Sequence, residues 1–142
     1  SLPQYAFVWI GNKEKVDNLP SNVFCLGEAH AAFFYLKYAD LFILTSNYEG
    51  LPMSLLEALA FGVPVVASKV GGIAEVLDGR NGYALENKTE LFTEKIEKIF
   101  SDEKIQKEMS DCARESYLTN FTVEKMVGRY MAVYNEIAIN KK

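Results

Sequence analysis

The chain has 142 residues, 49% of them apolar and 24% charged, which suits one folded domain with a real hydrophobic core. Its net charge of −4, with 15 scattered Lys and Arg residues, argues against nucleic-acid binding, which needs a concentrated basic face. No apolar run approaches the roughly 18 residues of a membrane span. We therefore expect a cytoplasmic protein with Cys25 and Cys112 as free thiols, and leave open a peripheral association of the full-length protein with a membrane.

The first part of the chain alternates between strand and helix patterns. Short apolar runs rich in β-branched and aromatic residues, each ended by Gly or Pro or a polar turn, occur at 5–10, 23–26, 41–45, 63–68 and 82–85. These runs are apolar on both faces, which predicts parallel strands covered on both sides. Helical patterns lie between them at 31–38, 52–61 and 73–77. The alternation predicts an α/β fold with a Rossmann-like parallel sheet and helices on both faces.

After Leu85 the pattern changes to helices only, over 90–100, 102–117 and 123–139. The last of these is expected to turn its apolar stripe inward, a stripe made of Met126, Val127, Tyr130, Val133, Tyr134 and Ile137. We therefore predict a single domain over residues 1–142. Its parallel α/β part covers about 5–87 and its C-terminal helices cover about 88–140.

The stretch 46–57, S-N-Y-E-G-L-P-M-S-L-L-E, joins a predicted strand to a predicted helix. Ligands of parallel α/β sheets bind beyond the carboxyl ends of the strands, which is where this stretch lies. Pro52 suits the first helical position, and the turn at Gly50 and Leu51 then leaves backbone N–H groups at the positive end of the helix dipole. This arrangement predicts a binding site for a phosphate or another anion.

Two carboxylates lie on either side of that turn. Glu57 is the only charged residue from Leu51 to Phe61 and stands about 7 Å along the helix from the phosphate position, which matches the reach from a pyrophosphate to a ribose. Glu49 would meet hydroxyl groups at the other end of the same ligand. The spacing alone leaves open that Glu57 lies on a solvated stripe and that Glu49 merely caps the helix.

Four motifs in order resemble a known family. They are E-G-L-P-M-S-L-L-E-A at 49–58, G-V-P-V-V-A-S at 62–68, G-G-I-A-E-V at 71–76 and G-R-N-G-Y at 79–83. Together they resemble the C-terminal donor domain of retaining GT-B glycosyltransferases of family 4, the glycosyl transferases group 1. The resemblance covers nearly the whole chain and implies a GT-B C-terminal domain that lacks its first strand and helix.

The resemblance implies a role for each site residue. Glu49, as the catalytic residue, would hydrogen-bond the donor sugar, Gly50 and Leu51 would give backbone N–H groups to the diphosphate or sugar, and Glu57 would hold the ribose. The full donor-binding set is Glu49, Gly50, Leu51, Glu57, Phe24, Gly27 and Gly72. The stretch from Phe24 to Gly27 would flank the base. Gly72 would border the cleft, although Gly71 and Gly72 also suit a tight turn that opens the next helix.

The resemblance also implies the reaction. A hexose would pass from a nucleotide-diphosphate sugar to a saccharide or lipid-linked acceptor in glycan or polysaccharide biosynthesis, with no metal or other cofactor. The phosphate-binding Arg and Lys and the acceptor-binding N-terminal domain would lie outside this chain, so the chain alone would be inactive. Two alternatives stay open: a non-catalytic binding or assembly module of the same fold, and another sugar-nucleotide enzyme such as an epimerase.

Other candidate residues are interpreted as structural or solvated. His30, the only histidine, is expected at the surface, and Lys69 and Arg80 are expected to be solvated cations rather than phosphate ligands. No Asp-x-Asp motif is present, and no group of residues has the spacing of metal ligands.

The family's sheet order, 3-2-1-4-5-6, raises a structural question. The absent first strand would lie between the strands at 5–10 and 41–45. Those two strands could pair directly, another chain could fill the gap as in a homo-oligomer, or part of the molecule could lie outside this sequence. The sequence leaves these three possibilities open.

Overall fold

The computed structural model describes residues 2–14 and 16–139, and its elements follow the predicted order. They are β1 (Phe7–Ile10), β2 (Val23–Gly27), the 3₁₀ helix η1 (Ala32–Tyr38), β3 (Phe42–Leu44), α1 (Met53–Ala60), β4 (Val65–Ser68), α2 (Ile73–Val76), β5 (Gly82–Leu85), α3 (Thr89–Phe100), α4 (Glu103–Asn120) and α5 (Val123–Ile139). The α/β alternation and the change to helices after β5 are confirmed. Residue 140, where the predicted helical part ends, lies outside the described residues.

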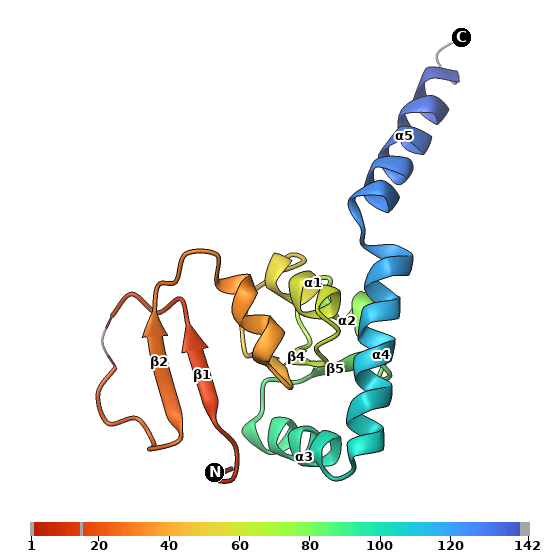
Figure 1. The fold of residues 1–142 in the computed structure, drawn as a ribbon. Helices are drawn as coiled ribbons and strands as arrows, with labels where there is room; N and C mark the ends of the chain where they lie inside the picture. Colours follow the sequence, from red (N-terminus) through yellow and green to blue (C-terminus); the bar gives the residue numbers. More distant parts are fainter. Residues whose placement is uncertain (1, 15, 140–142) are drawn as a thin grey trace.

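The strands form two separate parallel sheets. One contains β1 and β2, and the other has the order β3-β4-β5. Figure 1 shows the two-stranded sheet to one side of the rest of the molecule. The parallel direction of the strands, predicted from their apolar runs, is confirmed.

The three-stranded sheet is covered on both faces, as predicted. Every residue of β4 is buried, because Val65 and Ala67 pack into a cluster with α1 while Val66 packs on the opposite side against α3. Helix α4 contributes Ala113 to the first cluster and Met109 to the second. This sandwich of helices around β4 holds the carboxyl ends of the three strands in place.

The two-stranded sheet is not covered, and the prediction for it is wrong. Val8 and Trp9 of β1 are 56% and 46% exposed, and Phe24 and Leu26 of β2 are 51% and 47% exposed. Among the described residues, neither core cluster contains a member of β1 or β2. Apolar residues on both faces of a strand indicate that the strand needs cover, but they do not show that this chain supplies it.

No strand pairing joins β1 to β3 within the described part of the chain. Strand β1 is paired only with β2, and β3 only with β4, so each has one edge without a strand partner. Direct pairing, one of the three possibilities left open by the sequence, is therefore not what the structure shows. The sheet is interrupted where the family order places its first strand.

Helix α5 projects away from the body of the molecule (Figure 1). It has no buried residue, and the six apolar residues expected to face inward are 49–61% exposed. That prediction is wrong, because the stripe has helical period but the described residues do not cover it. Among the described residues, no helix is both long and apolar enough to cross a membrane.

Candidate functional site

The candidate site begins at the turn between β3 and α1. One face of helix α1 anchors it to the sheet, because Leu55, Ala58 and Leu59 are fully buried there. Pro52 is the N-cap residue, with extended backbone angles, rather than the first helical residue as predicted. The buried face of the helix therefore fixes the position of its N-terminus at the carboxyl end of the sheet.

Backbone N–H groups at this turn have no partner. Among the described residues, those of Gly50, Leu51, Met53 and Ser54 donate no hydrogen bond to the protein, and no side chain caps the helix. Pro52 has no N–H, so these four groups are the donors available from residue 50 to residue 54. With the helix dipole behind them, they form the local chemistry of an anion site.

The two carboxylates predicted at the site are both partly buried. Glu49 precedes the unpaired N–H groups, and Glu57 lies one turn into α1. Within the described part of the chain, neither carboxylate has a hydrogen bond or an ion pair, and Glu49 does not cap the helix. A partly buried carboxylate without a partner can accept hydrogen bonds from the hydroxyl groups of a ligand.

The turn after β4 packs directly against the turn after β3. The backbone N–H of Gly72 donates to the carbonyl oxygen of Gly50 at 2.7 Å, and Gly72 is also the N-cap residue of α2. Gly72 therefore opens a helix, as one interpretation predicts, and in the same place contacts the candidate site.

An open crevice of about 870 Å³ lies beside these turns. Its lining includes Gly50, Leu51, Gly71 and Gly72, together with residues of α2, of the loop 78–81, of the second half of α4 and Arg129 of α5. Neither Arg129 nor the contribution of α4 is predictable from local sequence, because both depend on how distant helices pack. The crevice borders the Gly50 turn on the side of the C-terminal helices, and neither Glu49 nor Glu57 lines it.

Arg80 is bound to the protein rather than free for a ligand. Its guanidinium donates to the Asp78 carboxylate through Nε at 2.9 Å and through Nη2 at 2.6 Å. Partial burial alone would raise the pKa of Asp78, but hydrogen bonds from Arg80 and from the Asn81 backbone outweigh it and lower that pKa. The expectation that Arg80 is not a phosphate ligand agrees with this pairing.

Phe24 and Gly27 lie in the other sheet, and neither lines the crevice. Phe24 is half-exposed on β2, and the Gly27 carbonyl accepts a hydrogen bond from the Gly11 N–H at 2.7 Å. The structure thus brings Glu49, Gly50, Leu51 and Gly72 together, while the predicted base-flanking residues remain on separate elements. Their role at the base stays a prediction.

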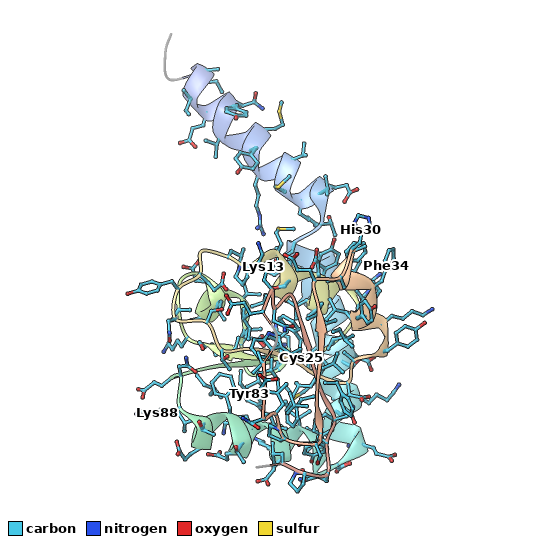
Figure 2. All side chains as sticks on the ribbon, turned by 90° about the vertical axis from the view of Figure 1, so that its left-hand side faces the viewer. Lys13, Cys25, His30, Phe34, Tyr83 and Lys88 are labelled. Atoms are coloured by element: carbon cyan, nitrogen blue, oxygen red, sulfur yellow. The ribbon has the colours of Figure 1, made fainter. Side chains whose placement is uncertain are left out.

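His30 lies at the surface, as expected, and is labelled together with Phe34 in Figure 2. Both cysteines are free thiols. Among residues 2–14 and 16–139, no three His, Cys, Asp or Glu side chains gather as metal ligands would.

Comparison with known proteins supports the family resemblance. The family described as Glycosyl transferases group 1 matches residues 5–116. The O-antigen biosynthesis glycosyltransferase WbnH of Escherichia coli is 34% identical over 137 residues, which cover 92% of this chain and 39% of WbnH. The chain therefore spans well under half the length of this relative.

Solved structures show the same fold. Anabaena HepE, solved in complex with UDP, superimposes with a TM-score of 0.84 over 94% of this chain and 42% of HepE, at 20% identity. A variant of S. aureus TarM, solved in complex with fondaparinux, alpha-GlcNAc-glycerol and UDP, gives a TM-score of 0.71 over 83% of this chain and 24% of TarM, at 29% identity. The fold is that of the GT-B glycosyltransferases, and the chain belongs to the glycosyl transferases group 1 family.

Proposed function

We propose that this chain forms the donor-binding half of a retaining glycosyltransferase. The whole protein would transfer a hexose from a nucleotide-diphosphate sugar to a saccharide or lipid-linked acceptor in glycan or polysaccharide biosynthesis. One observation carries the proposal. In a member of this family, N–H groups at the start of α1 that have no partner among the described residues stand in the sequence between two partly buried carboxylates that likewise have none. The UDP bound in the related TarM structure is consistent with such a donor.

The diphosphate would bind at the N–H groups of Gly50 and Leu51. Partial positive charge at the helix N-terminus favours an anion there, and a glycine at position 50 lets a phosphate approach the backbone closely. Met53 and Ser54 add two further N–H groups in the first turn of α1. Together with basic residues from elsewhere in the protein, these donors would stabilise the phosphate charge without a metal ion or other cofactor.

The hydroxyl groups of the donor would bind the two carboxylates. Glu57 stands about 7 Å along the helix from the phosphate position, so it can accept hydrogen bonds from both ribose hydroxyls. Glu49, before the turn, would accept hydrogen bonds from the hexose and is the residue that we assign to catalysis. One stretch of chain would thus bind the hexose at Glu49, the diphosphate at Gly50 and Leu51, and the ribose at Glu57.

The cationic part of the phosphate site would come from elsewhere in the protein. Chain outside these 142 residues would add a parallel strand between β1 and β3, and the carboxyl end of such a strand would lie beside the turn before α1. A basic pair at that position would stabilise the leaving diphosphate. By itself the present chain would then bind a donor weakly and turn over little or none.

Calorimetry with UDP, GDP and ADP on the full-length protein tests donor binding and identifies the base. We expect Glu57→Gln to weaken binding of the preferred nucleotide by about ten- to a hundredfold, because charged hydrogen bonds to the ribose are lost. Glu97→Gln, an exposed change on α3, is the matched control and should bind like the wild type.

Binding of none of the three nucleotides would contradict the proposal. Equal binding by the Glu57→Gln and Glu97→Gln variants would contradict the role of Glu57 at the ribose. Nucleotide binding without any sugar transfer by the full-length protein would instead support a non-catalytic binding module.

A further inference from the structure

Gly71, in the turn after β4, packs tightly against the backbone of Glu49 and Gly50 in the candidate site. Its φ of +53° lies in the left-handed region that side chains disfavour. A Cβ atom at Gly71 would overlap the carbonyl oxygen of Glu49 and stand 2.5 Å from that of Gly50. The turn after β4 can approach the turn after β3 this closely only because position 71 has no side chain.

Gly72 adds a hydrogen bond to this contact. Its N–H donates to the Gly50 carbonyl oxygen at 2.7 Å, and a Cβ atom at position 72 would stand 3.3 Å from the same oxygen. The Gly50 carbonyl is therefore directed toward Gly72.

Because peptide bonds are planar, these contacts also determine where the N–H groups of Gly50 and Leu51 point. In a trans peptide the C=O and the following N–H point in opposite directions. Directing the Gly50 carbonyl toward Gly72 therefore turns the Leu51 N–H away from it, and placing the Glu49 carbonyl against Gly71 turns the Gly50 N–H away in the same manner. The structure contains no cis peptide bond among the described residues.

We propose that Gly71 and Gly72 are positioning residues that aim the Gly50 and Leu51 N–H groups at the donor phosphates. The inference rests on the proposed function and deepens it, because it gives the turn after β4 a part in orienting the phosphate site.

Two glycine variants distinguish an effect on the orientation of the Gly50 and Leu51 N–H groups from a general loss of folding stability. Gly71→Ala introduces both backbone strain and a clash with the site turn. Gly79→Ala also introduces backbone strain, at φ +89°, but no atom lies within 4 Å of the new Cβ. Both variants should lower the unfolding temperature, so only effects confined to Gly71→Ala report on the contact between the two turns.

We expect Gly71→Ala in the full-length protein to weaken UDP binding by about tenfold or more, and Gly79→Ala to leave it within about twofold of the wild type. If another nucleotide is preferred by the wild type, that nucleotide replaces UDP. Amide NMR signals of Gly50 and Leu51 should shift in the Gly71→Ala protein and stay in place in the Gly79→Ala protein. These amide signals are sensitive to the orientation of the two N–H groups and can be measured in the ligand-free protein.

Gly72→Ala covers the case in which Gly71→Ala does not fold. Gly72 has an ordinary φ of −78°, so this change adds a tight contact without strain, and we expect a smaller loss of affinity of about two- to fivefold. Unmoved amide signals, or affinities equal to the Gly79→Ala protein, would overturn the positioning role while leaving the proposed function intact. A wild-type protein that binds no nucleotide would overturn the proposed function, and the amide signals would still test the geometry.

Discussion

Asp78 organises the loop at one end of the crevice through its single carboxylate. Its Oδ1 accepts the backbone N–H groups of Arg80 and Asn81 at 2.9 and 3.3 Å, and its Oδ2 accepts the Arg80 guanidinium. The loop in turn presents the buried Asn81 side chain, which donates to the Val76 carbonyl at 2.8 Å and to the Ser116 hydroxyl at 3.1 Å. One carboxylate thus helps to connect the loop before β5 to helix α4.

The lowered pKa of Asp78 predicts a pH-dependent contribution to stability. A carboxylate whose pKa in the folded protein lies below its ordinary value of 3.8 stabilises the fold above that value, and the effect is lost as the pH falls through the folded pKa. Asp78→Asn should therefore lower the unfolding temperature at pH 6 by no more than a few degrees, since water screens this half-exposed group.

Thermal unfolding from pH 6 down to pH 2 measures the effect. The gap between wild type and Asp78→Asn should narrow below pH 4, where the wild-type carboxyl also becomes neutral. A constant gap across this range would show that the substitution acts through shape rather than charge.

The residues of the site differ in how far the sequence could reveal them. Glu49 and Glu57 stand out in the sequence because they are charged residues just before and within an apolar helix. Local spacing places one on each side of the Gly50 turn in the sequence, but it does not decide whether either carboxylate meets a ligand. Asn81 and Arg129 could not be found in this way. The partners of Asn81 include Ser116 of α4, and Arg129 reaches the crevice only because of how α4 and α5 pack.

At the scale of elements, helices α3 and α5 carry similar apolar stripes with opposite outcomes. In α3, Phe92, Ile96 and Ile99 are buried, and Phe92 and Ile99 pack with Val66 of the sheet. In α5, no residue is buried. Helical periodicity shows which face of a helix needs to be covered, but the cover depends on tertiary structure that the pattern does not contain.

This contrast predicts different costs for the same substitution in the two helices. Ile99 is fully buried and Ile137 is 50% exposed, so Ile99→Ala should destabilise the chain by about 2–5 kcal/mol. Ile137→Ala should change the free energy of unfolding by no more than about 0.5 kcal/mol. Urea denaturation of the 142-residue chain measures both. A large loss from Ile137→Ala would show that α5 packs on something in solution, such as a second copy of the chain.

For the whole molecule, the parallel α/β plan was predictable because apolar runs and helical patterns alternate in the sequence. The division of the strands into two sheets was not predictable from residue patterns. Strand β1 has the apolar character of a central strand, yet its Val8 and Trp9 side chains are about half exposed. The residue pattern of β1 indicates a strand that is suited to being covered on both faces. Among the described residues, that cover is only partial.

Hydrogen exchange tests whether another strand completes the sheet. In the 142-residue chain, amides of β4 should exchange slowest, since this strand is buried and paired on both sides. Amides along the unpaired edges of β1 and β3 should exchange at least about a hundredfold faster. In the full-length protein these edge amides should become protected. Equally fast exchange in both proteins would contradict the proposed insertion of a strand between β1 and β3.

The open edges of β1 and β3 also affect how the isolated chain behaves in concentrated solution. Unpaired strand edges with apolar side chains are templates for pairing with other molecules. Dimers or fibrils formed by this 142-residue chain could therefore arise from the interrupted sheet itself. If the full-length protein places a further strand between β1 and β3, as we propose, an oligomer seen only in the 142-residue chain is an aggregation product. If a second copy fills the gap instead, the full-length protein forms the same oligomer.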